Sequence, residues 1–220
     1  MSTDLVIFDL DGVLVDSEPI SARIMAEAMV AEGIPFTVED AYEQCLGRSL
    51  ATNRAALERR YGRDLSAVFS TAMRGRLFDA FRSELRPIRG ARDMLEALAV
   101  PRCVASSSSP DRIELALELT GLLPLLAPHI FSATMVKRGK PAPDLFLHAA
   151  RQMAAEPGRC VVVEDSLAGV LAARAAGMRA LGFAGGGHAG GAGFGEALLA
   201  AGAALVFTEL PQLPGLIGEE

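Results

Sequence analysis

Along most of the chain, short apolar runs alternate with longer segments in which apolar residues recur at helical spacing. Short apolar runs rich in β-branched residues predict buried strands, and longer segments with an apolar residue every third or fourth position predict helices. The predicted strands cover residues 5–8, 102–105, 129–132, 159–163, 178–183 and 204–207. Most of them are followed by a helical segment. Because strands that alternate with helices form parallel sheets, the pattern predicts an α/β fold with helices on both faces of the sheet.

Residues 17–86 interrupt this alternation, because every periodic segment in them is helical. A capping box at Thr37 and Asp40 predicts the start of one of these helices. A purely helical insert after the first strand predicts a small helical cap domain over residues 17–86, with residues 1–16 and 87–220 as the core. The cap is rich in arginine, and most of these side chains are expected on solvated helix faces.

Composition narrows the class of protein. The chain has 220 residues, a net charge of -6 and 50% hydrophobic residues, enough for one sizeable core or a core plus a small domain. The acidic balance argues against nucleic acid or an anionic membrane as a partner, and no apolar stretch is long enough to span a bilayer. The 3 cysteines are far apart, which predicts buried free thiols in a reducing compartment. Without a signal-peptide pattern at the amino terminus, we expect a cytoplasmic protein.

Acidic residues follow two of the predicted strands. Asp9 and Asp11 come directly after the first strand and are followed by Gly12, and Glu164 and Asp165 come after the fourth. In open parallel sheets the ligand crevice lies at the carboxyl ends of the strands. Carboxylates that close together are costly unless a cation or a proton lies between them. A simple turn is the alternative for an isolated Asp-x-Asp-Gly segment, since Asp and Gly are common turn residues.

Two further strand ends carry polar side chains. Four serines, from Ser106 to Ser109, lead into a helix that begins near Pro110. Hydroxyl groups and free backbone N–H groups at a helix N-terminus suit a phosphate. Ser109 as the helix N-cap would explain only one of the four serines, so Ser106 is a candidate phosphate-binding residue. The third strand is followed by a loop that contains Lys140 before the next helix.

The segment of residues 185–190 matches the Gly-x-Gly-x-x-Gly pattern of dinucleotide-binding proteins. That fingerprint belongs in the first strand–helix–strand unit, with an acidic residue about 20 positions later. Here the match is late in the chain and lies in a glycine run, so we expect no nucleotide cofactor. We expect His188, within this segment, to be a loop residue rather than a substrate contact.

Four segments of the chain carry these residues: D-x-D-G-V-L-x-D-S-E, the serine run, G-K-P-x-P-D and V-E-D-S-x-x-G. In this order, and across the whole chain, they resemble the four motifs of the haloacid dehalogenase (HAD) superfamily. The first, third and fourth look like those of its β-phosphoglucomutase and phosphosugar phosphatase branch. This resemblance implies a Rossmann-like core and a small helical cap inserted after the first strand.

The resemblance also implies a role for each motif residue. Asp9 matches the nucleophile that forms an aspartyl-phosphate, and Asp11 matches the general acid and base. Ser106 and Lys140 match the residues that hold the transferring phosphoryl group, with Ser107 beside them. The implied cofactor is Mg²⁺, held by the carboxylate of Asp9, the backbone carbonyl of Asp11, Asp165 and Glu164. For Glu164 the alternative of orienting its neighbours stays open.

Three positions narrow the choice among the reactions of the superfamily. An acid at Asp11 indicates a phosphate ester, because the dehalogenases of the superfamily lack one there. Ser21 stands where β-phosphoglucomutases carry a histidine, and Arg48 is displaced from their phosphate-gripping arginine. Both departures favour a Mg²⁺-dependent phosphatase acting on a small phosphorylated metabolite, a sugar phosphate or sugar-acid phosphate. Arg48, and with less support Arg74 or Arg76, are candidate substrate contacts from the cap.

Two alternatives remain beside the phosphatase. One is a phosphosugar mutase of the β-phosphoglucomutase type. The other is a catalytically inactive protein that binds a phosphorylated ligand, although none of the four residues Asp9, Asp11, Lys140 and Asp165 is missing.

Overall fold

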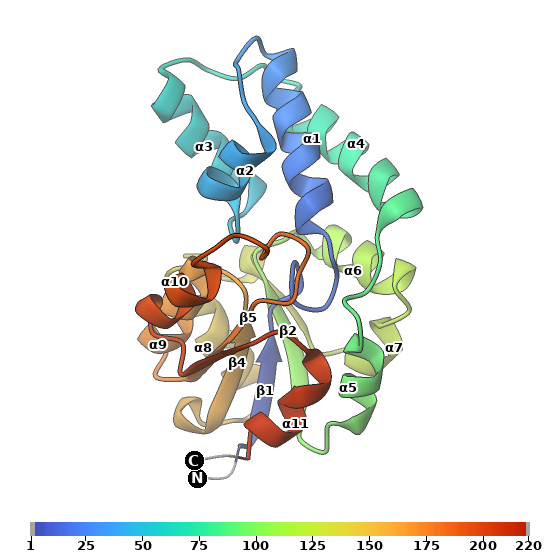
Figure 1. Ribbon diagram of the computed structural model, residues 1–220, viewed down its shortest axis with the longest axis vertical. Helices are drawn as coiled ribbons and strands as arrows, with labels where there is room; N and C mark the ends of the chain where they lie inside the picture. The colour runs from blue at the N-terminus through green and yellow to red at the C-terminus, as the bar shows by residue number, and fades with distance from the viewer. Residues whose placement is uncertain (1–2, 219–220) are drawn as a thin grey trace.

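The computed structural model describes residues 3–218, which form a parallel sheet of six strands in the order β3-β2-β1-β4-β5-β6, flanked by helices (Figure 1). The α/β prediction is confirmed. The strands are β1 (Leu5–Phe8), β2 (Arg102–Ser106), β3 (Ile130–Ser132), β4 (Cys160–Glu164), β5 (Arg179–Phe183) and β6 (Leu205–Phe207). All five pairs of neighbouring strands are parallel, so all six carboxyl ends lie along one edge of the sheet.

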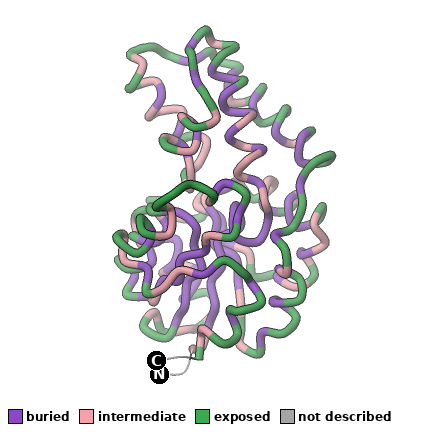
Figure 2. The backbone as a smooth tube through the Cα atoms, viewed as in Figure 1, coloured by how far each residue is buried: buried purple, intermediate pink, exposed green. Residues whose placement is uncertain are grey.

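The central strand explains why its sequence is apolar throughout. β1 pairs with β2 on one side and β4 on the other, with Ile7 opposite both Cys103 and Val162. Alternate side chains of a strand point to opposite faces. Accordingly Val6 and Phe8 belong to one buried apolar cluster, and Leu5 and Ile7 belong to another on the opposite face. The sheet is covered on both faces, as Figure 2 shows by the buried strands at the centre.

The α-helices after residue 90 lie between the strands or, in one case, after the last strand. They are α5 (Ala91–Ala97), α6 (Pro110–Leu119), α7 (Leu123–Leu126), α8 (Asp144–Gln152), α9 (Leu167–Ala175), α10 (Phe194–Ala201) and α11 (Leu213–Leu216). The three cysteines are free and buried, as predicted. None of the helices among the described residues is long and apolar enough to cross a membrane.

The remaining helices are α1 (Glu18–Ala31), α2 (Val38–Cys45), α3 (Leu50–Tyr61) and α4 (Phe69–Glu84). They stand together beyond the carboxyl edge of the sheet (Figure 1). α2 begins with the predicted capping box, in which Thr37 accepts a hydrogen bond from the Asp40 backbone while the Asp40 side chain accepts one from Thr37. Buried residues of α1 and α4, such as Met29 and Phe81, continue into the same apolar cluster as Phe8. The division into a core and a cap at residues 17 and 86 therefore stays a prediction.

Candidate active site

The loop after β1 places two aspartates at the carboxyl edge of the sheet. The Asp9 backbone N–H donates to the Val163 carbonyl at 3.0 Å, which prolongs the pairing of β1 with β4 by one residue. Gly12 then turns the chain with a φ of +76°, and a Cβ at this position would overlap the Asp165 carboxylate. Only glycine meets both conditions, the left-handed backbone and the close approach. The turn therefore packs the loop that holds Asp9 against the loop after β4.

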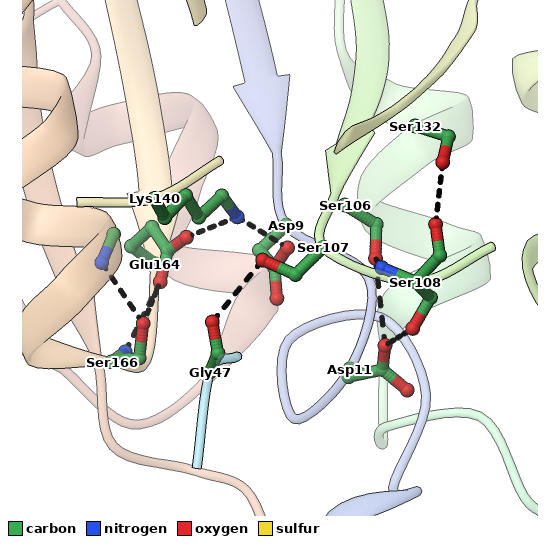
Figure 3. A network of polar contacts seen from close by, with 11 residues as sticks. Asp9, Asp11, Gly47, Ser106, Ser107, Ser108, Ser132, Lys140, Glu164 and Ser166 are labelled. Carbon is green, nitrogen blue, oxygen red and sulfur yellow. Dashed lines mark hydrogen bonds and ion pairs between the residues drawn. The ribbon is translucent and has the colours of Figure 1, made fainter. Parts of the chain in front are cut away.

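A buried lysine joins the ends of β1 and β4. The Lys140 Nζ lies 2.6 Å from Asp9 Oδ1 and 2.5 Å from Glu164 Oε1, and the side chains of all three residues are at most 7% exposed (Figure 3). Removal from water favours the neutral form of a lysine, but the two carboxylates outweigh it and raise the Lys140 pKa. Lys140 is therefore a fixed positive charge beside Asp9.

The acidic residues around this lysine fit a hard divalent cation. One ligand atom from each of Asp9, Glu164 and Asp165 lies within 4.8 Å of the others, and all three residues are buried. Burial, together with the negative charge of Glu164, raises the pKa of Asp9 and of Asp165 well above the usual range. Clustered, desolvated carboxylates are the surroundings that a bound Mg²⁺ stabilises. The donor set therefore fits the predicted ion.

Glu164 differs from the other two carboxylates, because both of its oxygens already accept hydrogen bonds. Oε1 accepts from Lys140, and Oε2 accepts from the Ser166 backbone N–H at 3.1 Å and from its hydroxyl at 2.9 Å. The Ser166 hydroxyl also caps α9 by accepting from the Gly169 N–H. Glu164 thus orients Lys140 and the start of α9, whereas Asp9 Oδ2 accepts no hydrogen bond from the described residues.

Asp11 has different surroundings. Its Oδ1 accepts from the Ser17 hydroxyl and from Arg112 Nη2, each at 2.6 Å, and its Oδ2 accepts from the Ser108 hydroxyl at 2.6 Å. Burial alone raises the pKa of Asp11, but Arg112 and the two hydroxyls more than reverse that shift, so its pKa lies below the usual range. In Figure 3 Asp11 lies beside Ser108, while Asp9 lies beside Lys140.

The serine run after β2 curves around this site. The Ser106 hydroxyl accepts from the Ser108 backbone at 3.1 Å and lies 3.5 Å from Asp11 Oδ2. Helices α1–α4 and the loops between them are called the helical layer below. The Ser107 hydroxyl donates to the Gly47 carbonyl of this layer at 3.1 Å. Ser109 stands at the predicted N-cap of α6, although its side chain makes no capping bond. Ser106 and Ser108 therefore lie against the Asp11 carboxylate, whereas Ser107 points toward the helices α1–α4.

A pocket lies between this edge of the sheet and helices α1–α4. Its lining includes Asp9, Asp11 and Ser107 from the core and Glu18 and Arg48 from the helical layer. Burial and the neighbouring carboxylates Asp11 and Asp165 raise the pKa of Glu18 to about 8. The pocket is thus bordered on one side by the sheet edge and on the other by residues of helices α1–α4 and their loops.

The three arginines that were predicted as candidate substrate contacts lie in different surroundings. Arg48 lines the pocket. Arg74 does not, because it forms an exposed ion pair with Asp111 and lies over the Phe78 ring. Arg76 is exposed and lines a separate surface depression near Glu32. Of the three, only Arg48 borders the pocket.

Four residues near the site had no assigned role in the sequence. Ser17 and Ser108 stand inside recognised segments, but their contacts with Asp11 follow from the loop conformation. Arg112 follows the serine run on the first turn of α6, where its charge is the only signal. His188 lies in the expected turn, yet it is buried and its Nε2 is 3.0 Å from Asp165 Oδ2. Burial lowers its pKa, which favours the neutral ring.

Comparisons with known proteins identify the family to which this chain is similar. The model of the haloacid dehalogenase-like hydrolases matches residues 3–177. The 6-phosphogluconate phosphatase of Escherichia coli K12 is 32% identical over 184 residues, which are 82% of each chain. Hexitol phosphatase A of the same organism is 33% identical over 78% of each chain. A haloacid dehalogenase-like protein of unknown function from Agrobacterium tumefaciens C58 superposes with a TM-score of 0.85 at 39% identity, covering 99% of this chain and 98% of that one.

Proposed function

The chain belongs to the haloacid dehalogenase-like hydrolase family, and we propose that it is a Mg²⁺-dependent phosphatase of a small sugar phosphate or sugar-acid phosphate. Two of its relatives are named as phosphatases, a 6-phosphogluconate phosphatase and a hexitol phosphatase. The observation that carries the proposal is the pairing of Asp9 with Lys140 at 2.6 Å, with Asp9 and the second aspartate, Asp11, lining the same pocket.

In the proposed first half-reaction a carboxylate oxygen of Asp9 attacks the phosphorus atom. The bond between phosphorus and the ester oxygen breaks, and Asp11 donates a proton to that oxygen as the alcohol leaves. In the second half-reaction Asp11 takes a proton from water, which attacks the aspartyl-phosphate and releases inorganic phosphate. Asp9 and Asp11 are then restored for the next turnover.

Charge in the transition state is balanced by groups already in place. Lys140 offers a fixed positive charge beside Asp9, and Ser106 and Ser107 bring hydroxyl groups to the same edge. Mg²⁺ would be held by Asp9, Asp165 and the backbone carbonyl of Asp11, and when bound it would neutralise the charge of the phosphoryl oxygens. Glu164 also orients Lys140, because its oxygens accept hydrogen bonds from Lys140 and Ser166, and it stays a candidate ligand beside Asp9 and Asp165.

On the other side of the pocket, helices α1–α4 are proposed to act as the cap. The pocket lining combines a positive residue, Arg48, with a titratable acid, Glu18. A hydroxylated substrate that carries an additional negative charge suits this pair. The cytoplasm, where phosphorylated sugars occur in a reduced environment, is the location that the free buried thiols favour.

The test is phosphate release from a panel of phosphorylated sugars, sugar acids, polyols and nucleotides, with Mg²⁺ and with a chelator. We expect metal-dependent release from sugar or sugar-acid phosphates and little from nucleotides. The same mixtures should be followed by NMR, because isomerised sugar phosphate without release would identify a mutase. Binding of these compounds without turnover would instead identify the inactive ligand-binding protein.

A further inference from the structure

The hydrogen bonds of Asp11 leave neither of its carboxylate oxygens free. Oδ1 accepts from Ser17 and Arg112, and Oδ2 accepts from Ser108, each at 2.6 Å. The pair of Arg112 and Asp11 is the only charged contact among the three, and its side chains are 19% and 10% exposed. These donors fix the direction in which the remaining lone pairs of the carboxylate point, and one of these must face the substrate oxygen for a proton to be exchanged. The partners of Asp11 therefore control when and how it can act.

Arg112 also contacts the helical layer on two sides. The Nη2 atom that binds Asp11 lies 3.1 Å from the Ser21 hydroxyl on α1. The guanidinium group lies over the Phe81 ring of α4, 5.3 Å from the ring centroid, which is a cation–π contact. Arg112 itself belongs to α6 of the core. A displacement of α1 or α4 would therefore change the support of Arg112, and with it the geometry at Asp11.

We propose that Arg112 is a positioning residue that sets the orientation of the Asp11 carboxylate and makes it depend on the placement of α1 and α4 through Ser21 and Phe81. The inference rests on the proposed function, because it requires Asp11 to act as the general acid. It adds a residue outside the four recognised segments to the machinery of the reaction. It also gives a physical connection between the helical layer and the acid, at the position where Ser21 replaces the family's histidine.

The proposal has a consequence that depends on the leaving group. An alkyl alcohol, such as the hydroxyl of a sugar, needs a proton from the general acid as its bond to phosphorus breaks, whereas p-nitrophenolate leaves without one. The ratio kcat/KM covers only the steps up to departure of the alcohol. Misplacing Asp11 should therefore lower kcat/KM for an alkyl phosphate and spare kcat/KM for p-nitrophenyl phosphate.

The experiment compares the wild-type enzyme with Arg112→Met and Arg112→Lys, using p-nitrophenyl phosphate and the best alkyl phosphate of the substrate panel. Methionine keeps an unbranched chain against Phe81 but removes the charge. Since small misplacements of catalytic groups cost about 10²-fold, we expect Arg112→Met to lower kcat/KM for the alkyl phosphate about 10- to 100-fold. The value for p-nitrophenyl phosphate should fall less than about 3-fold. Lysine, which keeps the charge, should recover part of the loss.

A matched control is Arg92→Met on α5, an exposed arginine of the core that pairs with Glu96. It should leave the ratio between the two substrates as in the wild type. Circular dichroism and the thermal midpoint of each variant show whether it is folded, and Arg112→Lys provides the test if Arg112→Met is not.

The contact with the cap is tested separately by Ser21→Ala. Alone, this change should lower kcat/KM for the alkyl phosphate by a smaller factor than Arg112→Met. In the Arg112→Met background it should have no further effect, because the contact that it removes is already absent. Independent, multiplicative effects would overturn the role of Ser21 in transmitting the position of α1.

Equal losses for the two substrates, no loss for either, or a lysine variant no better than the methionine variant would overturn the positioning role of Arg112. A wild-type enzyme that releases phosphate neither from p-nitrophenyl phosphate nor from any compound of the substrate panel with Mg²⁺ present would refute the proposed function itself, and this inference with it. The two failures are therefore told apart by the wild-type measurement.

Discussion

Asp9 and Asp11 stand two positions apart in one loop, and their surroundings act on them in opposite directions. Desolvation and neighbouring acids raise the pKa of Asp9, although Lys140 opposes them. Burial acts on Asp11 too, but Arg112 and two serine hydroxyls lower its pKa. Both directions run against the protonation states that the proposed roles require, because the nucleophile must be ionised and the general acid must hold a proton. A cation bound beside Asp9 would lower its pKa. The difference is set by the neighbours of each carboxylate, not by its residue type.

Replacing Asp9 tests its proposed role as the nucleophile. Asp9→Asn keeps the size of the side chain but removes the negative charge of the oxygen that attacks phosphorus. We therefore expect phosphate release to fall to background, while the circular dichroism spectrum stays that of the wild type. The control is Asp79→Asn, an exposed residue that pairs with Arg82 and should retain full activity. Metal-dependent release by Asp9→Asn at a rate close to wild type would contradict the assignment.

Glu18 gives a prediction about stability and pH. Its pKa is about 8 in the folded protein, compared with 4.5 as its ordinary value. Between these two pH values the folded chain holds a proton that the unfolded chain has lost, so this group lowers stability as the pH rises. Glu18→Gln removes the effect, and its thermal midpoint relative to wild type should increase by a few degrees between pH 5 and pH 8.5.

The control for this measurement is Glu27→Gln, on the same helix but with an exposed side chain. Thermal midpoints of the wild type and both variants in the same buffers, without added metal, provide the comparison. A Glu18→Gln midpoint that runs parallel to the wild type across the pH range would show that Glu18 is ionised normally in the folded protein.

At the scale of elements, local sequence signals were strong enough to predict most helices and strands. The capping box at Thr37 and the apolar run of residues 5–8 carry their own physical reasons, and both are found as predicted. The strand order could not be read in the same way, because it depends on which apolar faces pair after collapse. The contact of Arg112 with Asp11 spans 101 residues. Nothing near Arg112 in the sequence indicates that partner.

Two glycines of the helical layer provide a matched test of backbone preference. Gly75 lies inside α4 and Gly62 follows the end of α3 with a φ of +64°, and a Cβ at either position would meet no neighbouring atom. Gly75→Ala should raise the free energy of unfolding by about 0.5–1 kcal/mol, since alanine loses less conformational entropy in a helix. Gly62→Ala should lower it by roughly 1–2 kcal/mol, because the left-handed conformation is strained for alanine.

Urea denaturation followed by circular dichroism measures both changes in the free energy of unfolding. Opposite signs are the essential result. If both variants were destabilised equally, the loss would come from the new methyl group and not from the backbone conformation, and the end assigned to α3 at Gly62 would be wrong.

At the scale of the whole molecule, the site exists only where the sheet edge meets the helical layer. Asp9 and Lys140 are 131 residues apart in the sequence, and the core residue Ser107 is hydrogen-bonded to Gly47 from a position 60 residues away. Gly47 also packs against the loop after β4, because a Cβ there would lie 2.5 Å from the Ser166 Cβ. The short segment around Gly47 is therefore a point at which the helical layer rests on the loops that follow β2 and β4.

This contact predicts that Gly47→Ala will separate activity from stability. The added methyl group would push residues 46–49 away from Ser166 and weaken the hydrogen bond from Ser107, so the pocket should close less well over a substrate. Because misplacements of about 1 Å can cost about 10²-fold, we expect kcat/KM for a sugar phosphate to fall at least about 10-fold.

The control is Gly33→Ala. Gly33 has a positive φ of +76°, close to the +70° of Gly47, but no neighbour lies within 4 Å of the new methyl group. It carries the same backbone strain and should lower the thermal midpoint to a similar extent without the loss of kcat/KM. Similar kinetic losses in both variants would mean that strain in the helical layer, and not its contact with the core at Gly47, limits the reaction.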